Sequence, residues 1–112
     1  MIAELRGDYD GALDWYRQSL TINEELGNRA GIATSYGQMG VLLTNTGQPA
    51  DAIPHTIRAL AIHSQLGSTN VSTDLHWLGR QRELLGPDEF TMIAGQHLDP
   101  DSLTKLTGML DR

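Results

Sequence analysis

The chain has 112 residues, 39 % of them hydrophobic, which is enough for one small domain with a core. Its net charge of −6, with only eight Lys and Arg, argues against nucleic-acid binding, because that binding depends on basic side chains contacting phosphate. There is no cysteine, which excludes disulfides and thiolate metal sites, and no apolar run approaches the roughly 20 residues of a membrane span. We therefore expect a soluble, cytoplasmic, all-α protein without strands.

A segment near the N-terminus recurs later in the chain. Residues 7–27, GDYDGALDWYRQSLTINEELG, align with residues 47–67, GQPADAIPHTIRALAIHSQLG, at a shift of 40 positions. The shared positions hold glycines that can end helices and small or apolar residues that can face a neighbouring helix. Polar positions differ freely. This pattern is typical of repeated packing units and not of a repeated catalytic site.

The first predicted helix follows Gly7 and ends at Gly27. Asp8 or Asp10 can cap its start, and Gly27 can supply the left-handed residue that ends it. Only six residues precede Gly7, whereas a full helix is expected before its counterpart Gly47. The chain is therefore expected to begin inside a repeat, as the C-terminal fragment of a longer array.

The apolar stripe of this first helix consists of Ala12, Tyr16 and Leu20. In a complete repeat the stripe would pack on the missing helix. It is therefore expected to stay exposed here, and we expect the isolated chain to self-associate or fray at this uncapped N-terminal helix.

The second predicted helix spans residues 30–46 and contains two glycines. A glycine inside a helix costs about 1 kcal/mol relative to alanine and usually marks a point where another backbone comes close. Gly40 is interpreted in this way, and Gly37 as merely tolerated. The third helix is expected from Pro49, which suits a first turn, to Leu66. Pro54 should bend this helix without ending it.

The last three predicted helices close the domain. Residues 71–85 align with the second helix at a shift of 39, and a fifth helix is expected from Pro87 to about His97. Asp99 is expected to cap a sixth. We interpret the chain as one domain, divided as follows: 1–27 a truncated repeat, 28–67 a full repeat, 68–98 a degenerate repeat and 99–112 a capping helix.

The second and third helices carry a motif in which an aromatic residue, an apolar–glycine pair, a further apolar residue, a second glycine and an alanine follow at fixed spacing. Its residues are Tyr36, Met39, Gly40, Leu43, Gly47 and Ala52. The motif resembles the tetratricopeptide repeat signature, and Ala12 with Tyr16 matches the part on the second helix of a repeat. Thr56 stands where an aromatic is usual. The resemblance implies a right-handed α-α superhelix, a TPR-like solenoid with C-terminal capping helices.

The period of about 40 residues is closer to the repeats of kinesin light chains than to the usual 34. The sequences of the repeats are similar to those in C-terminal arrays of actinobacterial signalling proteins. In those proteins the repeats follow an NB-ARC NTPase or a transcriptional regulator. This chain has no glycine-rich phosphate loop, so no nucleotide hydrolysis is assigned to it. The resemblance implies non-catalytic protein–protein interaction by a scaffold or sensor module, without a cofactor. The alternative is a ligand- or peptide-binding regulatory domain that gates an attached effector.

Catalytic and metal sites are not predicted. The four histidines, at 55, 63, 76 and 97, lack metal-binding spacing, and the paired acids before helices are better explained as caps. Trp15 and Trp77 are interpreted as half-exposed packing residues, with partner contact as the alternative.

The resemblance implies that the first helix of each repeat lines a concave face that binds a protein or peptide partner. The residues expected there are Thr34, Gly37, Val41, Thr44, Thr73, His76, Arg80 and Glu83. The Lys and Asn clamp of chaperone-binding relatives is absent from these positions. The alternative interpretation of His76, Arg80 and Glu83 is a solvated face with local ion pairing.

Overall fold

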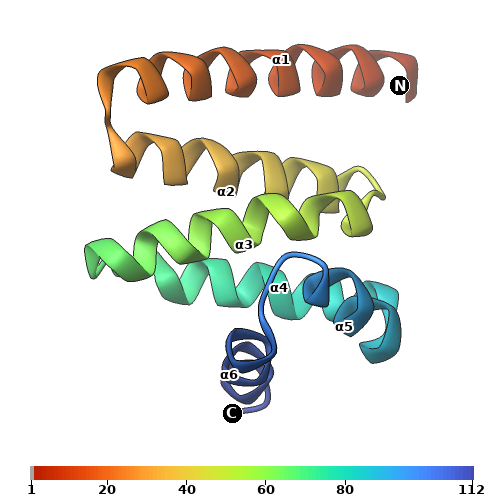
Figure 1. The fold of residues 1–112 in the computed structure, drawn as a ribbon. Coiled ribbons are helices and arrows are strands. Elements are labelled where there is room, and N and C mark those ends of the chain that lie inside the picture. Colours follow the sequence, from red (N-terminus) through yellow and green to blue (C-terminus); the bar gives the residue numbers. More distant parts are fainter. Residues whose placement is uncertain (1) are drawn as a thin grey trace.

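The computed structural model describes residues 2–112, and their side chains from residue 9 onward; all regular structure in this part of the chain is α-helical. The helices are α1 (Ile2–Leu26), α2 (Arg29–Asn45), α3 (Pro49–Leu66), α4 (Val71–Leu85), α5 (Pro87–Gly95) and α6 (Pro100–Leu110). Helices α1 to α4 lie one beneath the other as a layered stack, and α6 crosses the end of the stack at a steep angle (Figure 1). The predicted all-α helical-repeat fold is confirmed.

Glycines end the helices where the repeat predicts. Gly27 and Gly67, forty positions apart, follow α1 and α3 with φ of 68° and 66°. Gly47 and Gly86, thirty-nine positions apart, follow α2 and α4 with φ of 83° and 90°. Side chains other than glycine rarely adopt these left-handed conformations, so these four residues set the lengths of the stacked helices.

Side-chain caps and prolines define several helix starts. Asn28 accepts a hydrogen bond from the Gly31 amide at the start of α2. Asp99 accepts one from the Ser102 amide at the start of α6, which confirms the predicted cap. The Ser102 hydrogen bonds hold the pKa of the Asp99 carboxyl below its usual value. Pro54 lies inside α3 without ending it, which also agrees with the prediction.

The prediction for the start of the first helix is wrong. Helix α1 begins at Ile2 and continues through Gly7, so Asp8 and Asp10 lie inside it and not at its start. The counterpart Gly47 turns the chain and is followed two residues later by Pro49, whose missing N–H suits a new helix start. Gly7 is not followed by a proline, and α1 continues through it.

The predicted exposure of the first apolar stripe is also corrected. Its residues, Ala12, Tyr16 and Leu20, are half-buried, and α2 is the helix against which α1 packs. Different apolar side chains of α1 are exposed: Trp15 by 65 %, Ile22 by 54 % and Leu26 by 74 %. The apolar patch therefore lies on the outer side of α1.

Helices α2 and α3 form the largest interface, and Gly40 packs against Thr56 within it. A Cβ placed there would lie 2.3 Å from Thr56 Oγ1 and 3.5 Å from the Thr56 backbone nitrogen. At Gly37 the nearest atoms would be 3.8 Å away, an ordinary contact. The close approach predicted at Gly40 and the tolerated glycine predicted at position 37 are both confirmed.

The hydrophobic core joins the stack to the capping helices. Its large buried side chains come from four helices: Ile53 of α3, Leu78 of α4, Phe90 of α5 and Leu106 of α6, each at most 2 % exposed. Phe90 and Leu106 therefore bring α5 and α6 into the same core as α3 and α4. Because these helices share one core, the C-terminal pair stabilises the α3–α4 layer that lines the site described below.

A buried polar network lies beside this core. Gln81 is fully buried, and its Nε2 donates to Thr44 Oγ1 at 3.1 Å and to Thr56 Oγ1 at 2.9 Å. The two hydroxyls donate in turn to the carbonyls of Gly40 and Ala52. Both protons of the amide nitrogen are therefore used, and the network joins α2, α3 and α4 in one register.

His55 of α3 is a titratable group in a partly apolar setting. Its ring tilts against Tyr36 of α2, with the centroids 6.1 Å apart, and its Nδ1 is buried without a hydrogen-bond partner among the described residues. Burial lowers the pKa of His55 from 6.5, the positive charges of Arg58 and Arg17 lower it further, and Asp51 opposes them.

We expect this shift to make the protein less stable in acid. The unfolded chain takes up a proton at His55 more readily than the folded chain. The contribution of His55 to the free energy of unfolding is therefore complete above pH 6.5 and is lost as the pH falls through the lowered pKa of the folded chain. Urea unfolding at pH 7.5 and 5.0 should show that the free energy of unfolding falls less between these pH values in His55→Phe than in the parent chain. His97→Phe, at an exposed position, is the control; equal losses in both variants would contradict the assignment.

Candidate functional site

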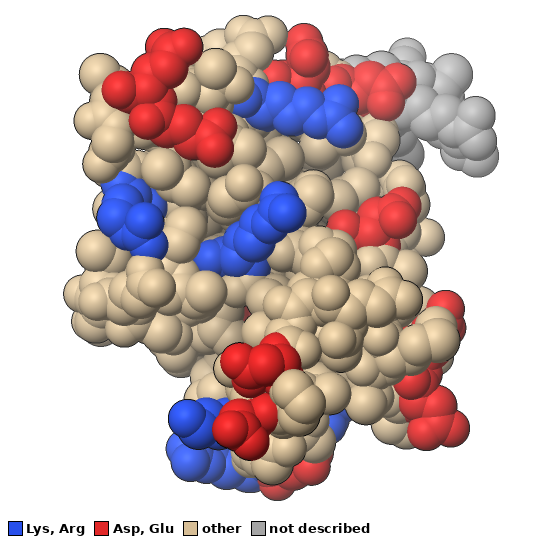
Figure 2. Space-filling view, viewed as in Figure 1, with Lys and Arg blue, Asp and Glu red and all other residues tan. Residues whose placement is uncertain are grey.

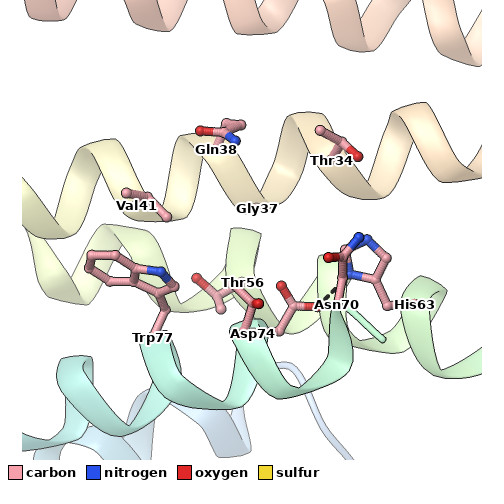
Figure 3. Close-up of a pocket in the computed structure, with 10 residues that line it drawn as sticks. Thr34, Gly37, Gln38, Val41, Thr56, His63, Asn70, Asp74 and Trp77 are labelled. Atoms are coloured by element: carbon pink, nitrogen blue, oxygen red, sulfur yellow. Dashed lines mark hydrogen bonds and ion pairs between the residues drawn. The ribbon is translucent and has the colours of Figure 1, made fainter. Parts of the chain in front are cut away.

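A cavity of about 160 Å³ lies between α2 and α4, with α3 behind it (Figure 3). We call this surface the α2–α4 groove. It is lined by Thr34, Gly37, Gln38 and Val41 of α2, Thr56 and His63 of α3, Thr73, Asp74 and Trp77 of α4, and Asn70 just before α4. Trp77 and Val41 lie at one end and His63 and Asn70 at the other, with Asp74 between them (Figure 3). Side chains from two successive helix pairs thus meet in one hollow.

The structure divides the eight predicted site residues among different places. Thr34, Gly37, Val41 and Thr73 line the α2–α4 groove together. Thr44 is 6 % exposed, and its hydroxyl accepts the hydrogen bond from Gln81 described above. It borders a separate hollow of about 430 Å³.

His76, Arg80 and Glu83 line another hollow of about 260 Å³, next to Met109 and Leu110 of α6. Successive residues of a helix are turned by about 100°, so the face of α4 that carries His76 lies beside the face that carries Thr73 and Trp77. Arg80 and Glu83 are 3.5 Å apart with side chains 53 % and 72 % exposed. A pair this exposed contributes about 0–1 kcal/mol, as the alternative of a solvated face with local ion pairing expects.

A buried pair of titratable side chains forms the floor of the groove. His63 Nδ1 lies 2.5 Å from Asp74 Oδ2, and each side chain is 6 % exposed. Burial raises the pKa of the Asp74 carboxyl, and the hydrogen bond from His63 works in the opposite direction. The imidazole N–H donating to Oδ2 connects the last turn of α3 to the first turn of α4.

The other carboxylate oxygen of Asp74 faces α2. A Cβ built on Gly37 would lie 3.8 Å from Oδ1, so the missing side chain of this glycine leaves space in front of that oxygen. His63 is the only hydrogen-bond partner of the Asp74 carboxylate among residues 9–112. Asp74 is also the only Asp, Glu, Lys or Arg among the residues that line this cavity.

Sequence reasoning missed this pair, although a signal existed. His63 stands four residues before Gly67, and Asp74 stands four residues after Asn70. Two antiparallel helices joined by a short turn bring such mirror positions together. Trp77, for which partner contact was the alternative interpretation, lies one helical turn beyond Thr73 and lines the same cavity.

Other classes of site receive no support from the described residues. Within that part of the chain, no three His, Asp or Glu side chains lie close enough together to hold a metal ion. None of the described helices combines the length and apolar character needed to cross a membrane. On the face shown in Figure 2, the Lys and Arg side chains of the described residues stand apart, with acidic ones among them.

Comparison with known proteins identifies a family. The family model of the tetratricopeptide repeat matches residues 1–65, which is more than half of the 112-residue chain. No curated protein and no solved structure matches the chain significantly. The matched segment covers α1 and α2 and nearly all of α3.

Proposed function

This chain belongs to the tetratricopeptide repeat family, whose repeats generally mediate protein–protein interaction, and we propose that it binds a segment of a partner protein in the α2–α4 groove without catalysing a reaction. We further propose that it is a scaffold or sensor module of a bacterial signalling or regulatory protein in the cytoplasm. The observation that carries the proposal is the cavity itself, which combines side chains of α2, α3 and α4.

The lining of the groove suits an extended peptide. The hydroxyls of Thr34 and Thr73 and the amides of Gln38 and Asn70 offer hydrogen bonds from exposed positions to a peptide backbone, and Trp77 offers an aromatic surface. A peptide that is unstructured before binding can follow such a row of groups along the groove. Affinity would come from these contacts and from shape, with no cofactor.

The second candidate is a regulatory domain that binds a peptide or small ligand and gates an attached effector. The buried pair of His63 and Asp74 favours it, because polar groups on the floor of a pocket can recognise one specific ligand group. The cavity, at about 160 Å³, is below the 300–1,000 Å³ typical of small-molecule sites. A peptide therefore fits both candidates better than a cofactor-sized molecule.

Selection from a random peptide display library tests the proposal. We expect the chain to enrich a set of peptides, Trp77→Ala to lose most of their binding, and Trp15→Ala to keep it. Trp15 is a matched control, because it is 65 % exposed on α1 and does not line the cavity. Enriched peptides that bind both variants equally well would place the binding surface elsewhere and overturn the proposal.

We also expect weak self-association through the outer side of α1. Trp15, Ile22 and Leu26 follow one another at spacings of seven and four residues, so they share one exposed apolar face. Analytical ultracentrifugation should show association that increases with concentration and is reduced in Trp15→Ser combined with Ile22→Ser. A parent chain that stays monomeric at several hundred micromolar, on the order of the highest practical concentration, would refute this expectation.

A further inference from the structure

We infer that the α2–α4 groove selects a positively charged side chain, the ammonium of Lys or the guanidinium of Arg in the bound peptide, and holds it against the Asp74 carboxylate. The inference rests on the proposed function and specifies the chemistry of the partner. It follows from the charge, the accessibility and the size of the cavity.

The charge of the cavity comes from one residue. Asp74 is the only acid or base of the Asp, Glu, Lys and Arg classes that lines it, and the other residues apart from His63 are uncharged. The carboxylate accepts the His63 hydrogen bond at Oδ2, and accepting a hydrogen bond does not remove its negative charge. A buried negative charge attracts a cation and repels an anionic ligand more strongly than the same charge in water would.

The carboxylate is also incompletely satisfied. Oδ2 has the His63 hydrogen bond, whereas no residue of the described part donates to Oδ1, which faces the space left by Gly37. Burial raises the pKa of the Asp74 carboxyl, and the hydrogen bond from His63 opposes this effect. A donor that carries a positive charge would supply the missing compensation in a charge-assisted hydrogen bond.

The remaining lining fits the stem of a long basic side chain. Val41 and Trp77 provide apolar surface at one end of the cavity, and the Trp77 ring can also attract a cation that passes over its face. Liquid water occupies about 30 Å³ per molecule, so a cavity of about 160 Å³ has room for a single side chain but not for a folded ligand.

The same peptide selection, run in parallel on variants, tests this inference. The parent chain should enrich peptides with Lys or Arg at one fixed position, and Asp74→Asn should select without that preference. Replacing the basic residue of an enriched peptide by norleucine should weaken its binding to the parent chain by about tenfold or more, but should change its binding to Asp74→Asn little. Thermal unfolding checks that the nearly isosteric Asp74→Asn is folded.

A second variant leaves the buried pair untouched. Gln38→Lys adds a positive charge at an exposed position on the rim of the cavity and should weaken the same peptides. Gln18→Lys adds the same charge at an exposed position on α1 and should not. If peptides depend on Trp77 but show no basic preference, or if norleucine binds equally well, the inference is wrong while the proposed function stands. If no enriched peptide depends on Trp77, the proposed function fails as well.

Discussion

Replacing Phe90 by alanine is expected to lower the free energy of unfolding by about 3–5 kcal/mol. The ring is 1 % exposed and packs in the core that joins α3, α4, α5 and α6, so its loss leaves a cavity that neighbouring helices cannot easily fill. A domain of this size has a stability of about 5–15 kcal/mol, so the variant should be marginal at 37 °C. Urea unfolding at 25 °C measures the difference.

The matched control for this substitution lies on the same helix. Met92 is 61 % exposed, and Met92→Ala should change the free energy of unfolding by no more than about 0.5 kcal/mol. If Phe90→Ala were equally mild, α5 would not belong to the core, and the C-terminal helices would not stabilise the α3–α4 layer beneath the groove.

Alanine at positions 37 and 40 is expected to change stability in opposite directions. At Gly40 the new Cβ would lie 2.3 Å from Thr56 Oγ1, an atom held by the hydrogen bond from Gln81. Overpacking of this kind costs about 1–3 kcal/mol, which should exceed the roughly 1 kcal/mol gained in helix propensity. At Gly37 the methyl group makes only ordinary contacts at 3.8 Å, so the gain should remain.

Thermal unfolding of the two variants provides the measurement. Gly40→Ala should unfold at a lower temperature than the parent chain, and Gly37→Ala at a higher one. The pair shares its helix, its residue type and its substitution, so general effects of alanine cancel in the comparison. Two shifts of the same sign would contradict the close approach of α2 and α3 at Gly40.

Local signals allowed most of the helix boundaries to be predicted. Gly27, Gly67 and Gly86 end helices because their left-handed conformations exclude most other residues, and Pro49 and Pro87 mark first turns. These residues act through their own backbone. Their effect can therefore be read from the chain without knowledge of its tertiary contacts.

Gly7 shows where the repeat alignment was misleading. It occupies the position of Gly47, yet α1 passes through it. Pro49 reinforces the helix end at Gly47, but Gly27 and Gly67 end helices without a following proline. A shared glycine alone was therefore weak evidence for a helix end.

The site was predicted less well than the fold, because it depends on how the helices are rotated against one another. Thr73 and His76 lie less than one turn apart on α4, yet they line different hollows. The periodicity of α4 shows which of its residues share a face, but it does not show which face contacts α2. The buried pair of His63 and Asp74 depends on the same rotation, combined with the length of the turn between α3 and α4.

The measurement that tests the account most directly is an NMR titration of the ¹⁵N-labelled chain with a peptide enriched by the selection. We predict saturable shifts at the Trp77 indole N–H and at the backbone amides of Thr34 and Thr73, which come from two helices but line one cavity. Shifts confined to the outer side of α1 or to α6, with these three signals unchanged, would show that the α2–α4 groove is not the binding site.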